Sequence, residues 1–313
     1  MGSSPTDREL PTRVTIREVR PRDGLQAEKP LPVQARASMI DALGAAGVSK
    51  IEAVSFVSPR AVPAMADAAE VWARTTKRKG VAYSALVPNR RGAEEAVSAG
   101  DFASLQAFLS ASDGYNQKNV GKTVEESIMD VIDVVAVGRS AAIPVECTIS
   151  VAFGDPFEGH VPAERVIVLA KRLVEVGVAG ISLGDTIGMA TPAQVERMVV
   201  SFRDRLANVP LNLHFHDTRS TAMANLLAAL RAGATEFDAS VGGLGGSPFA
   251  PGAGGNVATE DLVISMKDLG VETGVHLGRL LDAARLVESL IGHPLASAAS
   301  KAGSSARRPR EGG

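Results

Sequence analysis

The chain has 313 residues, is 45% hydrophobic and carries a formal net charge of −2 at pH 7. The hydrophobic fraction supports a substantial core, and the lack of a basic excess argues against nucleic acid or an anionic membrane as the main partner. No apolar run reaches the roughly 18 residues that span a bilayer, and the N-terminus has no signal-peptide region. We therefore expect a soluble, cytoplasmic protein with neither nucleic acid nor membrane as a partner.

The single cysteine, Cys147, excludes an internal disulfide and a cysteine-rich metal site. It lies in the apolar run 143–153, so we expect a buried and inert thiol. Residues 1–12 are polar and contain two prolines, and residues 298–313 show no periodicity. We expect both ends to be disordered and residues 13–297 to form one domain.

Short β-rich runs alternate with longer helical patterns along the chain. Helical periodicity is present at 32–46, 125–139, 163–176, 193–206 and 222–232. Eight strand-helix units of roughly 25 to 40 residues predict a (β/α)8 TIM barrel, here with short additional helices at the C-terminus. The alternative, a doubly wound open sheet, lacks its Gly-rich fingerprint after the first strand. The strand-like runs begin near Arg13, Lys50, Gly80, Ser104, Pro144, Gly180, Leu211 and Glu236.

Active sites of this barrel form on the loops that follow the carboxyl ends of the strands. Arg22 and Asp23 follow the first strand, and His214 and His216 end the seventh. The i, i+2 spacing in a strand places both imidazoles on one face, which suits a divalent metal ion. Two hydrogen-bonded histidines at a strand end are the alternative.

A Gly-rich segment, 242–255, follows the eighth strand and ends at Asn256. Seven of its fourteen residues are glycine, so it is either a solvated linker or a mobile loop that closes over a ligand. Its place between two well-patterned segments favours the loop. Strands one, seven and eight adjoin one another in a closed barrel, so the candidate ligands converge at one side of the same mouth.

Glu52 lies within the second strand, among apolar neighbours. A buried acid is costly unless it is paired, and Arg22 is the nearest candidate partner. A solvent-facing strand position is the alternative, which the covering of barrel strands on both faces weakens.

Taken together, the motifs resemble the hydroxymethylglutaryl-CoA lyase family, within the wider group of metal-dependent aldolase and Claisen-type barrels. The similarity runs in matching order from about Val14 to the helix after Asp261. The segments that carry it are Val19-Arg20-Pro21-Arg22-Asp23-Gly24-Leu25-Gln26, Glu52 with Ser55-Phe56-Val57-Ser58-Pro59, Pro156-Phe157-Glu158-Gly159, Ser182-Leu183-Gly184-Asp185-Thr186-Ile187-Gly188, His214-Phe215-His216-Asp217-Thr218, and Gly245-Gly246-Ser247-Pro248-Phe249-Ala250-Pro251-Gly252 followed by Gly255-Asn256.

The resemblance implies cleavage of 3-hydroxy-3-methylglutaryl-CoA, or a closely related 3-hydroxy acyl-CoA, to acetyl-CoA and a 3-oxo acid. It implies that Asp23 acts as the base, that Arg22 and Gln26 contact the substrate, and that Glu52 holds the Arg22 guanidinium. It also implies an acyl-CoA partner and a homodimer. The implied ligands of a Mg2+ or Mn2+ ion are Asp23, His214, His216 and Asn256.

The sequence departs from the family pattern at three positions. Ser247 stands where the loop normally carries the catalytic cysteine, and a hydroxyl is a much weaker acid than a thiol. Asp155 replaces another cysteine and could lie near the same mouth, and Ser220 replaces a common glycine. Contacts with CoA are weakly encoded, and the basic or polar candidates are Lys29, Asn89, Arg90, Arg91 and Lys118.

These changes leave several functions open. Three interpretations are compatible with them. In the first, the chain is a slow lyase of this family. In the second, it is a relative that cleaves another 3-hydroxy acyl-CoA, and in the third, it is a barrel that keeps the metal and has lost the lyase step. An acetyl-CoA condensing enzyme of the same barrel group and a non-catalytic metal-binding homologue are further alternatives. Because the metal and arginine positions are all present, we favour a working carbon-carbon lyase.

Overall fold

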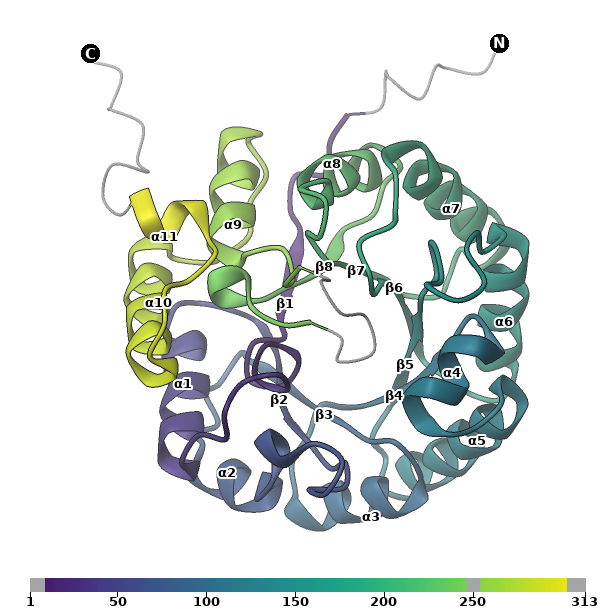
Figure 1. Ribbon diagram of the computed structural model, residues 1–313, viewed down its shortest axis with the longest axis horizontal. Helices are drawn as coiled ribbons and strands as arrows, with labels where there is room; N and C mark the ends of the chain where they lie inside the picture. Colours follow the sequence, from purple (N-terminus) through teal and green to yellow (C-terminus); the bar gives the residue numbers. More distant parts are fainter. Residues whose placement is uncertain (1–8, 247–253, 303–313) are drawn as a thin grey trace.

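The computed structural model describes residues 9–246 and 254–302, so Ser247 lies outside the described residues. Eight parallel strands close into a barrel in the order β1-β2-β3-β4-β5-β6-β7-β8, and helices surround it, as Figure 1 shows from one end. The predicted TIM barrel is confirmed. No helix among the described residues is long and apolar enough to cross a membrane.

The strands start within about two residues of the predicted positions, as expected for boundaries read from sequence patterns. They are β1 (Thr15–Glu18), β2 (Lys50–Ser55), β3 (Ala82–Leu86), β4 (Ser104–Ser110), β5 (Val145–Ser150), β6 (Gly180–Asp185), β7 (Leu211–Phe215) and β8 (Glu236–Ala239). The α-helices are α1 (Val33–Ala45), α2 (Ala68–Arg74), α3 (Arg90–Ala99), α4 (Asp113–Val120), α5 (Val124–Ser140), α6 (Ala163–Glu175), α7 (Pro192–Arg205), α8 (Ala222–Arg231), α9 (Thr259–Asp268), α10 (Leu277–Ile291) and α11 (Ala298–Ala302). Three short 3-10 helices are η2 (Asp23–Leu25), η3 (Pro63–Met65) and η4 (Val241–Gly243).

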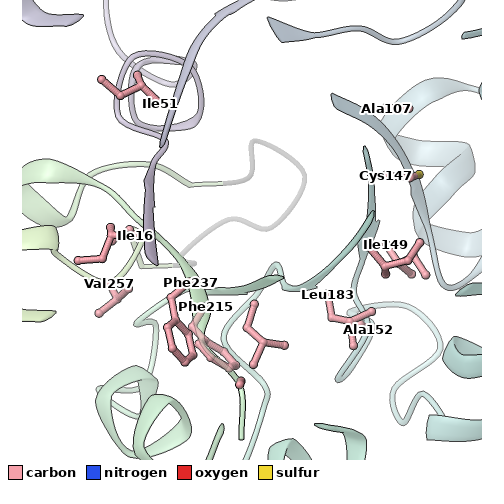
Figure 2. Close-up of a cluster of buried hydrophobic side chains, with 14 of the residues drawn as sticks. Ile16, Ile51, Ala107, Cys147, Ile149, Ala152, Leu183, Phe215, Phe237 and Val257 are labelled. Carbon is pink, nitrogen blue, oxygen red and sulfur yellow. The ribbon is translucent and has the colours of Figure 1, made fainter. Parts of the chain in front are cut away.

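Alternate residues of each strand face opposite sides of the barrel wall. Those that pack outward against the helices form the main apolar core, and Figure 2 shows Ile16, Phe215 and Phe237 grouped within it. Cys147 is also buried in this outer layer, and burial raises the pKa of its thiol, as predicted for an inert cysteine.

The inward-facing residues differ from the branched apolar layers that usually fill such a barrel. Here the interior is polar, because most strands place a hydrogen-bonding side chain where an aliphatic one is common. These side chains bond to one another across the barrel, which satisfies groups that would otherwise be costly to bury. The buried or partly buried members are Arg17, Gln106, Glu146, Ser182, Asn212, His214 and Asp238.

The described structure extends beyond the predicted domain at both ends. The expectation that residues 298–313 are disordered is wrong for its first part, because 298–302 form α11. The Asp261 carboxylate accepts hydrogen bonds from the backbone N–H groups of Ala298 and Ala299, which satisfies the first turn of that helix. Near the other end, the Thr12 carbonyl accepts a hydrogen bond from the N–H of Glu272.

Ser220, in the loop between β7 and α8, has a φ of 55°, in the left-handed region that favours glycine. This conformation gives a physical reason for the glycine that the family commonly has there. A serine costs roughly 1 to 2 kcal/mol in this region, partly offset by the greater entropy of glycine in the unfolded chain.

We therefore predict that Ser220→Gly raises the free energy of unfolding by about 0.5 to 1 kcal/mol in urea denaturation. Ser201→Gly, within α7, is the matched control. It should lower the free energy of unfolding by a similar amount, because a glycine in a helix relieves no strain and only increases the flexibility of the unfolded chain. Equal destabilisation by both substitutions would show that the conformation of Ser220 is not strained.

Candidate active site

Three of the predicted ligands lie together at the carboxyl ends of neighbouring strands. Asp23 follows β1 in η2, His214 lies near the end of β7, and His216 follows it. Strand β8 pairs with both β1 and β7, which brings these segments side by side. One possible ligand atom from each of the three side chains lies within 4.8 Å of the others, and all three side chains are buried. The convergence predicted from strand order is present.

One nitrogen of each imidazole forms a hydrogen bond, which leaves the other nitrogen available to a metal ion. Nδ1 of His214 lies 2.9 Å from Oδ2 of Asp238, and Nδ1 of His216 lies 3.0 Å from the carbonyl oxygen of Gly254. Since both partners accept hydrogen bonds, they favour a proton on Nδ1 and a lone pair on Nε2. This is the usual arrangement of histidines that bind a metal.

Asn256 completes the donor set. Its Nδ2 donates to Oδ2 of Asp23 at 2.6 Å and to the carbonyl of Leu244 at 3.0 Å. Its Oδ1 is buried and has no hydrogen-bond partner within the described chain. Buried polar atoms rarely lack a partner, so this oxygen is a candidate ligand atom. One carboxylate, two imidazoles and one amide oxygen fit a divalent ion such as Mg2+ or Mn2+.

Glycine is required beside this amide. Gly245 has a φ of 125°, and a Cβ atom there would collide with Nδ2 of Asn256 and approach Oδ2 of Asp23 to 2.9 Å. The lack of a side chain therefore lets the start of the Gly-rich segment lie directly against two of the ligand residues.

Arg22 connects the candidate ligand Asp23 to the barrel wall. Its Nε forms an ion pair with Glu52, as predicted, and its Nη1 donates to Oδ1 of Asp23 at 2.7 Å. Gln26 donates to the same carboxylate oxygen at 3.1 Å and to the carbonyl of Gly246 at 3.2 Å. The Arg22 side chain is mostly buried and lines the cavity described below, so its charge faces the space in which a substrate would bind.

Electrostatics set the protonation of these groups. Burial acts to raise the pKa of Asp23, but Arg22 and the two imidazoles outweigh it and hold that pKa below its ordinary value. Burial lowers the pKa of His216 to about 4, with a contribution from nearby His214, so His216 is neutral at pH 7. Burial also acts to lower the pKa of His214, but its hydrogen bond with Asp238 raises it overall.

A cavity of about 460 Å3 opens from this cluster across the barrel mouth. It includes Asn89, a candidate for CoA binding, together with Lys122, which the sequence did not suggest. Its lining, as the described residues define it, does not include the other candidates. Arg90 is paired with Asp133, and Arg91 with Glu95. The remaining two, Lys29 and Lys118, are not part of the lining either.

Asp155 lies in the loop after β5, at the same mouth as expected, but it does not line this cavity. It is buried, accepts hydrogen bonds from the backbone N–H groups of Phe157 and Glu158, and bonds to Ser112 at the N-terminus of α4. Its carboxylate is thus committed to a turn and to the start of a helix.

Comparison with known proteins identifies the family. The sequence matches the HMGL-like family over residues 13–287. The hydroxymethylglutaryl-CoA lyase YngG of Bacillus subtilis is 44% identical over 288 residues, which are 92% of this chain and 96% of the relative. The chain belongs to the hydroxymethylglutaryl-CoA lyase family. A Pseudomonas aeruginosa relative named 3-hydroxy-3-isohexenylglutaryl-CoA/hydroxymethylglutaryl-CoA lyase is 40% identical and covers 94% of this chain and 98% of its own.

Solved structures of hydroxymethylglutaryl-CoA lyases share the fold throughout. The Bacillus subtilis enzyme superposes with a TM-score of 0.89 at 44% identity, covering 94% of this chain and 99% of its own. The Acinetobacter baumannii enzyme, in complex with coenzyme A and 3-methylmalate, has a TM-score of 0.90 at 39% identity, with coverages of 95% and 98%.

Within this lyase-family site, sequence reasoning missed two buried charges, Arg17 in β1 and Asp238 in β8. Both are charged residues inside barrel strands, as Glu52 is, although each of these strands contains a second charged residue. Burial acts to raise the pKa of Asp238, but the adjacent guanidinium of Arg17 and the hydrogen bond from His214 hold it well below its usual range. Asp238 is therefore an ionised acceptor beneath the metal-ligand cluster.

The base of the Gly-rich loop of this family member is held by two buried carboxylates. Glu18 accepts hydrogen bonds from the N–H of Val241 at 3.0 Å and from the hydroxyl of Thr259 at 2.6 Å. Glu260 accepts from the N–H of Gly242 at 3.0 Å. Burial raises the pKa of each carboxyl to about 7, despite these hydrogen bonds.

This shift predicts a pH-dependent contribution of Glu18 to stability. Since its folded pKa exceeds its ordinary value of 4.5, the contribution is fully present below about pH 4.5 and is lost as pH rises through about 7. The difference in free energy of unfolding, wild type minus Glu18→Gln, should fall by about 1 to 3 kcal/mol between about pH 5 and 7.5.

Glutamine keeps the shape of Glu18. Its oxygen can accept from the N–H groups of Arg20 and Val241, and its NH2 group can donate to the hydroxyl of Thr259, so the comparison isolates the charge. Urea denaturation of both proteins across this pH range measures the difference. A difference that does not change with pH would contradict the shifted pKa.

Proposed function

We propose that this protein cleaves 3-hydroxy-3-methylglutaryl-CoA to acetyl-CoA and acetoacetate, as a metal-dependent carbon-carbon lyase. The observation that carries the proposal is the cluster of Asp23, His214 and His216, with the unpartnered Oδ1 of Asn256 and the charge of Arg22 beside it. The names of the relatives, and the complex of one solved relative with coenzyme A, support the same substrate class.

The proposed ligands of a Mg2+ or Mn2+ ion are Asp23, His214, His216 and Asn256. When bound there, a divalent ion would make a coordinated substrate hydroxyl more acidic and orient the carbon-carbon bond to be broken. The mixed oxygen and imidazole donors suit these two ions better than a structural zinc.

Asp23 and Arg22 would both act in the bond-breaking step, Asp23 as the base and Arg22 as the stabilising charge. The Asp23 carboxylate accepts the hydroxyl proton of the substrate, and its low pKa makes it a weak base that depends on an acidified hydroxyl. Arg22, held by Glu52, stabilises the oxygen on which negative charge develops. Gln26, which bonds to both Asp23 and the Gly-rich segment, would align the substrate beside them.

The thioester enolate that leaves must then gain a proton at carbon. The family position for this acid is Ser247, on the loop segment outside the described residues. A serine hydroxyl would relay a proton from water less effectively than a thiol would supply one. We therefore infer a lyase whose slow step is protonation, with cleavage itself intact.

Purified protein should release acetyl-CoA from hydroxymethylglutaryl-CoA when Mg2+ or Mn2+ is present, and EDTA should abolish the release. His214→Ala should lower kcat/KM by at least about 100-fold, because a ligand is lost. Ser247→Cys should raise kcat, since a thiol is a far stronger acid.

A coupled spectrophotometric assay for acetyl-CoA measures all three proteins. Cys147 is buried in the outer core, so Cys147→Ser serves as a control for the number of thiols and should not change kcat beyond about twofold. Absence of turnover in both wild type and Ser247→Cys would argue for the condensing or the non-catalytic alternative.

One observation favours a second, broader substrate. The side of the cavity formed by β2, β3 and β4 and the segments that follow them, opposite β7 and β8 in the closed ring, has a group of apolar side chains among polar ones such as Ser58 and Asn89. Such a wall could accept a 3-alkyl group longer than methyl, as the name of the Pseudomonas aeruginosa relative indicates for that protein. The apolar side chains are Val57, Ala61, Val62, Met65, Leu86 and Phe108.

If this wall holds a long alkyl group, 3-hydroxy-3-isohexenylglutaryl-CoA should also be cleaved. Leu86→Phe, which narrows the wall, should then lower kcat/KM for the long substrate by at least about tenfold and leave that for hydroxymethylglutaryl-CoA within about threefold. Cleavage of the methyl substrate alone by the wild type would restrict the protein to hydroxymethylglutaryl-CoA.

The resemblance also leads us to infer a homodimer and a cytoplasmic location. A curated relative from rat carries the word cytoplasmic in its name, and several other relatives are named as mitochondrial.

A further inference from the structure

We propose that Asp238 is a positioning residue that holds His214 in the form that binds metal, and that Arg17 in turn fixes Asp238. This inference deepens the proposed function, because it concerns the support of the same metal centre. It assigns a role to two charges inside the barrel that make no direct contribution to the ligand set.

Strand register places Asp238 between the two residues. In the β1–β8 pair Arg17 lies opposite Asp238, and in the β7–β8 pair His214 lies opposite Asp238. All three side chains face the barrel interior and are buried. One carboxylate on β8 therefore joins the polar interior to the metal-ligand cluster.

Each oxygen of the Asp238 carboxylate is engaged by two donors. Oδ1 accepts from Nε of Arg17 at 2.7 Å and from Nδ2 of Asn212 at 2.8 Å. Oδ2 accepts from Nη2 of Arg17 at 2.9 Å and lies 2.9 Å from Nδ1 of His214. The bidentate contact with the Arg17 guanidinium fixes the plane of the carboxylate, so the carboxylate presents Oδ2 to His214 in one orientation.

Arg17 is itself anchored on the far side of the barrel. Its Nη1 donates to Gln106 of β4 at 2.9 Å and to Glu146 of β5 at 3.1 Å, and Nη2 lies 3.4 Å from the hydroxyl of Ser182 in β6. A side chain held at this many points has little rotational freedom. The position of His214 is therefore fixed relative to several strands, because the Arg17 guanidinium bonds to side chains from each of them.

The consequence for His214 concerns which nitrogen carries the proton. A carboxylate that accepts hydrogen bonds from all its neighbours requires a proton on Nδ1, which leaves the lone pair of Nε2 for the metal. Asn256 and His216 are supported differently, by main-chain carbonyls and by Asp23. Loss of Asp238 should thus affect the ligand His214 selectively.

Asp238→Asn tests this orientation with almost no change in shape. Both groups at Oδ1 are N–H donors, from Arg17 and Asn212, whereas at Oδ2 only Nη2 of Arg17 must donate, because the imidazole of His214 can change tautomer and accept. The amide oxygen should therefore occupy the Oδ1 side, and the NH2 group should face His214. A donor there requires an unprotonated Nδ1, which moves the proton of the neutral imidazole to Nε2 and removes the lone pair that would bind the metal. The expected result is a roughly 10- to 100-fold loss of Mn2+ affinity.

Mn2+ binding to the substrate-free protein, measured by electron paramagnetic resonance of free Mn2+, gives the affinity. Asp155→Asn is the matched control, because it makes the same substitution at a buried carboxylate outside the cavity lining, and its Mn2+ affinity should stay within about threefold of wild type. Unchanged affinity in Asp238→Asn would overturn the proposal, as would an equal loss in both variants.

A second measurement is made on the wild type and does not depend on the folding of Asp238→Asn. The chain has five histidines, so 15N-histidine labelling and long-range 1H–15N correlation can identify each neutral tautomer in the metal-free wild type. The His214 signals are assigned by their loss in His214→Gln. A proton on Nδ1 of His214 supports the proposal, and a proton on Nε2 overturns it.

These readouts separate the inference from the proposed function. Metal affinity and tautomer are measured without substrate, so a wild type that binds Mn2+ through His214 but does not cleave hydroxymethylglutaryl-CoA would reject the proposed substrate alone. A wild type that cleaves the substrate and keeps its Mn2+ affinity in Asp238→Asn would reject the positioning role alone.

Discussion

The ion pair between Arg17 and Asp238 is the interaction on which the arrangement of the site depends. Both charges are buried, and removing Arg17 would take away the guanidinium that compensates the Asp238 carboxylate in a low-dielectric interior. The pair forms only when β8 meets β1 in the observed register. A slip of one residue in β8 would turn the buried ring of Phe237 into the polar interior, so closure of the barrel and assembly of the site are one event.

The charges of the site balance only in part. Asp23, Glu52, Glu146 and Asp238 are opposed by Arg17 and Arg22, which leaves two net negative charges when both imidazoles are neutral. A bound divalent cation would bring this sum to zero. In a buried site, where uncompensated charge is costly, the balance favours occupation of the centre by such an ion.

Much of this arrangement could be predicted from the sequence, because it follows from strand order. The alternation of strands and helices predicts the barrel, and its closure places Asp23, His214 and Asn256 side by side. The pairing of Glu52 with Arg22 follows from the cost of burying an acid. These inferences need only the order of the elements and not their register.

The remaining features depend on contacts that a one-dimensional pattern does not encode. Arg17 and Asp238 are 221 positions apart, and only the register of β1 with β8 shows that they meet. Oδ1 of Asn256 lacks a hydrogen-bond partner among the described residues because Asp23 and Leu244 hold the amide by its Nδ2. The helix after Pro294 depends on the Asp261 carboxylate, which supplies acceptors that the local composition does not suggest.

Both flanks of the Gly-rich segment are attached to residues of the proposed metal centre. Before residues 247–253, the carbonyls of Leu244 and Gly246 bond to Asn256 and Gln26, and after them the carbonyl of Gly254 bonds to His216. A change in length outside that interval would displace a ligand. Changes in the length of the segment should therefore be confined to 248–253, because Ser247 is the proposed acid and the groups on either side hold the ion-binding residues.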